Sequence, residues 1–197
     1  MDMPTPETPA AAYLPHSAYT TARVAADPKT TGRQSALATA HANLKAALLQ
    51  RDELKETEQH KIALLDMADD AADTDIEGFQ LHLLAALGKN RDHVKYLRYF
   101  RDGLRAVTTA EPRKEEPEIV DDMIALMIED DHDPEIGAVV HQWRPKLERS
   151  LENVIAADEA LTLVEKALGQ LDDAKLPMLM TSWREEYKRV EAALMTV

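Results

Sequence analysis

Apolar residues recur at intervals of three and four along most of the chain from residue 35 onward, and no stretch alternates with a period of two. The first spacing gathers apolar side chains on one face of a helix, whereas alternation would indicate a strand. We therefore predict an all-α fold: an elongated antiparallel helical bundle of about six helices, preceded by an extended proline-rich N-terminal arm.

Start and stop signals divide the first half of this pattern into three helices. The first is predicted over 35–65 and begins with a serine, a common N-cap, although its middle (51–61) is polar on nearly every side. The second is predicted over 75–88, where a closing glycine is a typical C-cap. The third is predicted over 91–107.

Prolines and acidic residues mark the elements of the second half. Residues 108–117 hold two prolines among charged residues and predict a linker, after which 118–129 predict a short helix. An Asp-Pro-Glu start predicts a long helix over 133–169, in which Pro145 would produce a kink or a break. A last helix is predicted over 176–194.

The first 33 residues differ from the rest, because they contain half of the ten prolines. Proline fixes φ and removes a hydrogen-bond donor, so this stretch predicts an extended arm whose contacts would come from Tyr13, Leu14 and Tyr19. A tail without contacts, a clasp on a neighbouring subunit and packing on its own bundle all stay open. The predicted division is an arm (1–33), a first helical half (34–107), a linker (108–117) and a second helical half (118–197).

Charge narrows the choice of partners. The chain has 23 Lys and Arg against 36 Asp and Glu, a formal net charge of -13. This excess of negative charge argues against an extended nucleic-acid surface and against binding to anionic membranes. We therefore expect protein partners, other copies of the chain first, and neither nucleic acid nor membrane.

One segment departs from this acidity. Residues 89–105 hold six basic and two acidic residues, between two acidic segments. Four basic residues with aromatic residues between them fall near one helical stripe: Arg91, Lys95, Arg98 and Arg105. Such a pattern occurs in nucleic-acid binders, but its acidic surroundings favour pairing with acidic helices of its own or a neighbouring chain.

Two methionines form a second candidate surface. Met123 and Met127 lie with three isoleucines on one broad face of the helix over 118–129. Methionine adapts to irregular partners, so this helix can dock in a groove of another protein. Packing in its own core is the simpler interpretation.

The sequence holds little that points to catalysis, metals or cofactors. There is no cysteine, and a di-iron site would need a second Glu-x-x-His pair beside 129–132. Residues 73–78 imitate the first half of a calcium loop, but the required glutamate at its twelfth position is Leu84. No serine lies in a Gly-x-Ser-x-Gly turn, and the seven histidines are scattered. We predict no catalytic residue, no metal site, no cofactor and no small-molecule substrate.

The leading hypothesis is a non-enzymatic structural or assembly subunit that self-associates through its arm and its charged helices, as in a filament, tube or particle. The alternative is a helical adaptor or chaperone-like module that binds proteins through the Met-rich and basic helices. A carboxylate-bridged metal protein is the third hypothesis. The sequence holds no signal-peptide pattern and no apolar run long enough for a membrane span, so a cytoplasmic protein or a virion component is expected.

Overall fold

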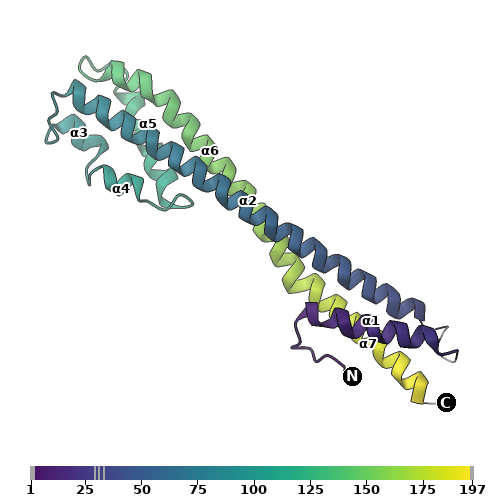
Figure 1. Ribbon diagram of the computed structural model, residues 1–197. Helices are drawn as coiled ribbons and strands as arrows, with labels where there is room; N and C mark the ends of the chain where they lie inside the picture. Colours follow the sequence, from purple (N-terminus) through teal and green to yellow (C-terminus); the bar gives the residue numbers. More distant parts are fainter. Residues whose placement is uncertain (1–2, 29, 31, 33, 196–197) are drawn as a thin grey trace. The chain divides into compact units, whose positions relative to one another are not determined.

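The computed structural model describes residues 3–28, 30, 32 and 34–195, with side chains up to residue 192. Within these ranges the chain is helical and contains no strand, which confirms the all-α class (Figure 1). Five helices have fifteen residues or more, against about six predicted. They are α1 (Ala10–Ala26), α2 (Gln34–Ala86), α5 (Glu115–Glu129), α6 (Gly137–Gln170) and α7 (Leu176–Met195). The shorter elements are α3 (Val94–Tyr99), α4 (Leu104–Thr108) and the π-helical turn η2 (Leu171–Lys175).

The chain forms two compact units, and α2 and α6 each contribute residues to both. The terminal unit comprises Met1–Glu58 and Leu163–Val197, and the middle unit comprises Gln59–Thr162. Residues 108–117, which the sequence predicts to be a linker, lie within the middle unit: they include the last residue of α4, the connection over 109–114 and the first three residues of α5.

The core of the terminal unit is built where α1 packs on α7 (Figure 1). The Tyr13 ring lies edge-on against Trp183, with ring centroids 5.3 Å apart. The indole nitrogen of Trp183 donates a hydrogen bond of 2.5 Å to the hydroxyl of Ser17, and all three side chains are fully buried. Leu37 and Leu44 of α2 complete this core.

The prediction of an extended arm is wrong for residues 10–26, which form α1. Three consecutive alanines begin this helix, and alanine has the highest helix propensity. Pro15 lies inside α1 and cannot donate the backbone hydrogen bond of that turn. Burial of the neighbouring Tyr13 and Ser17 against Trp183 offsets this loss, so tertiary packing decides the conformation.

The middle unit has a larger core formed by α2, α5 and α6 together with the aromatic residues of α3. Phe79 of α2 and Met127 of α5 are fully buried in it, as is Leu147 of α6. Trp143 of α6 packs on Gly78 of α2, where an added Cβ would lie 2.2 Å from the indole ring. The close approach of these two helices therefore depends on the missing side chain.

Three predicted helix boundaries differ from the structure. α2 continues through residues 66–74, which hold four aspartates but also three alanines and neither glycine nor proline to end a helix. α6 likewise continues through Pro145, since Trp143 and Leu147 are both buried around it. The helix predicted over 91–107 is instead divided into α3 and α4 at Gly103, whose φ of +86° is unfavourable for other residues.

Candidate functional site

Half of the predicted basic stripe is paired within the middle unit. The ammonium group of Lys95 lies 2.7 Å from an Asp133 oxygen and 2.8 Å from a Glu135 oxygen. The guanidinium of Arg98 pairs with Glu129 and, at 2.8 Å, with Asp130. These contacts join α3 to the end of α5 and to the segment that follows it, so Lys95 and Arg98 stabilise the fold.

A tyrosine completes this network. The hydroxyl of Tyr99 donates a hydrogen bond of 2.8 Å to the second Asp130 oxygen. Burial, followed by this hydrogen bond to a carboxylate, raises the pKa of Tyr99 well above its usual value. Hydrogen bonds to Asp133 and Glu135 likewise raise the pKa of Lys95, and the bond from Lys95 lowers the pKa of Asp133.

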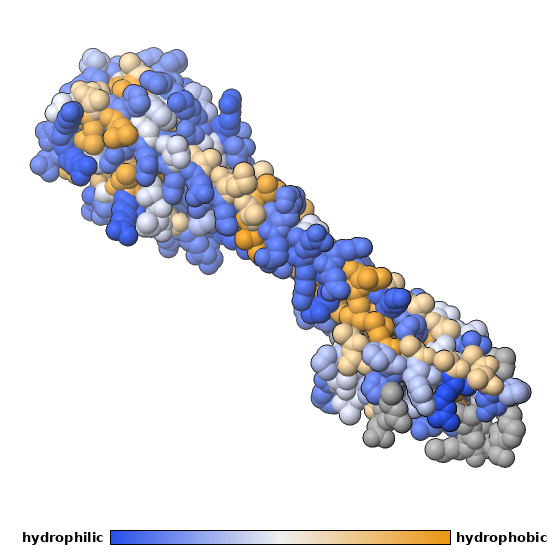
Figure 2. All heavy atoms as spheres, in the orientation of Figure 1, coloured by the Kyte–Doolittle hydropathy of each residue, from blue (hydrophilic) through white to orange (hydrophobic). Residues whose placement is uncertain are grey.

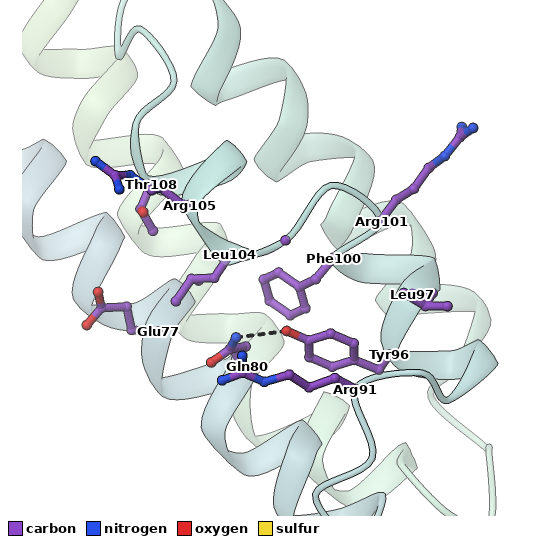
Figure 3. A pocket seen from close by; sticks show the side chains of 11 residues that line it. Glu77, Gln80, Arg91, Tyr96, Leu97, Phe100, Arg101, Leu104, Arg105 and Thr108 are labelled. Carbon is purple, nitrogen blue, oxygen red and sulfur yellow. Dashed lines mark hydrogen bonds between the residues drawn. The ribbon is translucent and has the colours of Figure 1, made fainter.

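The other half of the stripe, Arg91 and Arg105, lies at a pocket of about 640 Å³ between α2, α3 and α4 (Figure 3). The pocket is also lined by Arg101, which points away from the aromatic rings in this view. Among the described residues, no ion pair is formed by any of these three exposed arginines. Their charge is therefore available to a binding partner.

The floor of the pocket is aromatic and fixed by the core beneath it. Tyr96 and Phe100 are stacked, with ring centroids 5.4 Å apart. The side-chain amide of Gln80 donates a 2.8 Å hydrogen bond to the Tyr96 hydroxyl, as Figure 3 shows. Because Gln80 and both rings are buried, this floor keeps its shape before any partner arrives.

The rim of the pocket is not uniformly basic. The exposed carboxylate of Glu77 lies on the same side of the pocket as Arg105 in Figure 3. Exposed apolar side chains of Leu97 and Val94 lie on the neighbouring helix α3. The site therefore combines three available cations with exposed aliphatic side chains above a buried aromatic floor, an arrangement suited to protein surfaces that mix acidic and apolar residues.

A second unusual cluster is acidic and buried. Glu116 at the start of α5 is only 3% exposed, and one of its carboxyl oxygens has no hydrogen-bond partner. Burial, contact with Asp69 and the charges of Asp69 and Asp73 raise the pKa of Glu116 strongly. Burial and neighbouring carboxylates also raise the pKa of Asp73, to about 6. This cluster carries protons at a pH where ordinary carboxyl groups have lost them.

The structure offers no metal site within the described residues. No three His, Asp or Glu side chains there are arranged to hold an ion. Residues 73–78, the imitation of a calcium loop, are helical and belong to α2. Glu129 of the single Glu-x-x-His sequence is paired with Arg98.

The remaining predicted interaction residues are mostly buried in their own unit. Tyr13, Met123 and Met127 belong to the two cores, and Leu14 packs against the core of the terminal unit. Packing in its own core, the simpler interpretation of the methionine face, thus agrees with the structure. Of these residues, Tyr19 alone, which is 48% exposed, offers side-chain surface to another molecule.

Sequence reasoning missed three residues of these sites. Arg101 belongs to the basic segment but lies off the predicted stripe, because α3 and α4 do not form one helix. Gln80 carries no distinctive pattern. Glu116 does carry a signal, since it continues the buried face of α5 at the spacing 116, 120, 123 and 127.

Comparison of the chain with protein-family models, with curated proteins and with solved structures finds no match. None of the described helices combines the length and apolar character that crossing a membrane requires. The functional argument therefore depends on the chain's own residues.

Proposed function

We propose that this protein is a non-enzymatic assembly subunit, which associates with other copies of itself through charged surfaces of its helices. The observation that carries the proposal is the arginine pocket: Arg91 and Arg105 flank an aromatic floor and have no ion-pair partner among the described residues. A chain of net charge -13 offers abundant acidic surface to such a pocket.

Electrostatics support a protein partner. Acidic residues surround the basic segment in the sequence, and Glu77 lines the pocket itself. The negative charge around the pocket would repel a polyanion such as nucleic acid at long range. Nucleic-acid binding also usually needs several basic side chains that neutralise phosphates. An acidic protein surface can instead place a few carboxylates at the arginines and apolar groups on the floor.

The role of the arm changes in this proposal. Tyr13 and Ser17 are occupied by Trp183 of the same chain, so α1 packs on its own bundle. Self-association therefore relies on the arginine pocket, and Tyr19 is the arm residue left for a contact between copies. We place the protein in the cytoplasm or in an assembled particle such as a virion.

The mass in solution tests this function. Light scattering over a concentration series is expected to detect species heavier than the 22.0 kDa chain. The double substitution Arg91→Glu and Arg105→Glu should reduce the measured mass. As a control of equal charge change, Lys45→Glu with Lys55→Glu alters two exposed lysines of the terminal unit and should leave the mass unchanged. A strict monomer at every concentration would contradict the proposal.

The same pocket supports one alternative, a helical adaptor that binds an acidic segment of a different protein. The preformed floor beneath a pocket of about 640 Å³ favours it. A monomeric protein that binds an acidic peptide containing apolar residues, and loses this binding in the double arginine variant, would establish the adaptor instead.

A further inference from the structure

The exposed side of α5 carries an acidic stripe, which we define as Glu115, Glu118 and Asp122. Their spacing of three and four places them on one face of the helix. All three are exposed, and none forms an ion pair among the described residues. The opposite side of α5 is buried in the core through Val120 and Met123, so the stripe faces away from its own unit.

Helix stability explains only part of this stripe. Glu115 and Glu118 lie in the first turn of α5, where negative charge favours the helix dipole. Asp122 lies beyond that turn, four residues after Glu118, and like charges at this spacing repel each other. The stripe therefore carries an uncompensated charge that a cationic surface would relieve.

The middle unit carries such a surface at the arginine pocket. Lys95 and Arg98 are occupied by acidic groups of their own unit, whereas Arg91 and Arg105 are not. A single copy thus holds an acidic and a basic surface, and neither is neutralised by an ion pair within the described residues. Two copies can neutralise both.

From this complementarity we infer that the acidic stripe of one copy docks at the arginine pocket of a second copy. The inference rests on the proposed self-association and names the two surfaces that meet. Carboxylates of Glu118 and Asp122 accept hydrogen bonds from Arg91 and Arg105 of the other copy, and the aromatic floor excludes water beneath them. Because the two surfaces differ, each copy offers one surface of each kind, which is the property needed for rings and filaments.

Mixing of two variants tests this pairing. One variant carries Arg91→Glu and Arg105→Glu, and the other carries Glu118→Lys and Asp122→Lys. Each alone presents two surfaces of like charge and should associate at least about tenfold more weakly than the natural protein, because like-charge contacts suppress binding. An equimolar mixture has the natural total charge and restores opposite charges at both contacts, so its mass should return toward that of the natural protein.

Circular dichroism checks that each variant keeps the helical fold. If a charge-reversed variant unfolds, the neutral variants Glu118→Gln with Asp122→Asn and Arg91→Gln with Arg105→Gln replace the pair. Each neutral variant should weaken association in the same direction and by less.

Four outcomes would overturn the inference. The natural protein associates but folded variants associate equally well, or the mixture of folded charge-reversed variants stays monomeric. Both leave the proposed assembly function standing and reject this pairing. A single-stranded DNA oligonucleotide that binds the natural protein without weakening its self-association, and no longer binds the Arg91→Glu, Arg105→Glu variant, would assign the pocket to nucleic acid. A natural protein that stays monomeric throughout rejects the assembly function as well.

Discussion

Different interactions hold the helices together in the two units. In the terminal unit, α1 is fixed to α7 by aromatic contact and a buried hydrogen bond between Trp183 and Ser17. In the middle unit, charged groups enter the structure: Arg98 and Tyr99 converge on Asp130, and the carboxyl group of Glu116 is buried beside other acids. The terminal unit therefore depends mainly on apolar burial, and the middle unit also depends on protonation and charge.

The middle unit uses some of its basic side chains in ion pairs that stabilise the fold and leaves others, in the part of the chain that the structure describes, without such partners. Within the basic segment, Lys95 and Arg98 fix α3 to its own unit, while Arg91 and Arg105 line a pocket without ion-pair partners among the described residues. Each prediction below tests one side of this contrast, from the largest expected effect to the smallest.

The terminal unit should be broken by Trp183→Ala. The substitution removes a fully buried indole and leaves the Ser17 hydroxyl without its donor, so a loss of about 3–5 kcal/mol is expected. Hydrogen exchange of the α1 amides measures it, with α5 amides as the reference for the middle unit. Tyr19→Ala, at an exposed aromatic of α1, is the control and should change stability by less than about 0.5 kcal/mol. Equal protection of α1 in the Trp183 variant and the natural protein would refute the account of this unit.

The helix contact in the middle unit should be broken by Gly78→Ala. An added Cβ would lie 2.2 Å from the Trp143 ring, so overpacking of about 1–3 kcal/mol should outweigh the gain in helix propensity. Gly169→Ala is the matched control, since its Cβ would meet only one side-chain atom at 4.0 Å, and it should stabilise by about 0.5–1 kcal/mol. Denaturant unfolding measures both. Effects of the same sign at the two glycines would contradict the packing described.

The stability of the middle unit should depend on pH through its buried carboxyl groups. Glu116 and Asp73 hold protons in the folded middle unit at a pH where the unfolded chain has lost them, because their folded pKa values are raised above 4.5 and 3.8. The folded state then binds more protons, so stability falls as the pH rises through this window. The lowered pKa of Asp133 acts below 3.8, outside a comparison of about pH 5 with about pH 8.

Hydrogen exchange corrected for intrinsic rates, or denaturant unfolding, should therefore give a more stable middle unit at the lower pH. Glu116→Gln should raise stability at the higher pH and flatten the pH dependence, whereas Glu152→Gln, at an exposed position of the same unit, should do neither. If the stability of the Glu116 variant depends on pH as that of the natural protein does, the buried carboxyl group of Glu116 is not the cause of this dependence.

The sequence predicts an element well where the spacing of nearby residues determines it, and poorly where a contact distant in the sequence decides the conformation. The spacing of Trp183, Tyr187 and Val190 predicts the last helix over 176–194, and the structure places α7 at Leu176–Met195. Pro15 suggests an extended arm because composition does not reveal that Tyr13 meets Trp183, 170 residues further along.

The candidate site was predictable in part. Arg91 and Arg105 follow from the charge of their segment, but their separation from Lys95 and Arg98 depends on the turn at Gly103 and on the acidic segment that α3 meets. These are contacts across 30 or more positions, and residue types alone do not specify them.

The salt dependence of self-association tests the central claim most directly. Sedimentation equilibrium would measure the association constant of the natural protein from about 0.05 M to about 0.5 M sodium chloride, a range over which the Debye length falls about threefold. We predict that association weakens at least about tenfold over this range, and that the residual association of the Arg91→Glu, Arg105→Glu variant varies much less. An association that is unchanged or strengthened by salt would contradict an interface made by the arginine pocket and an acidic surface.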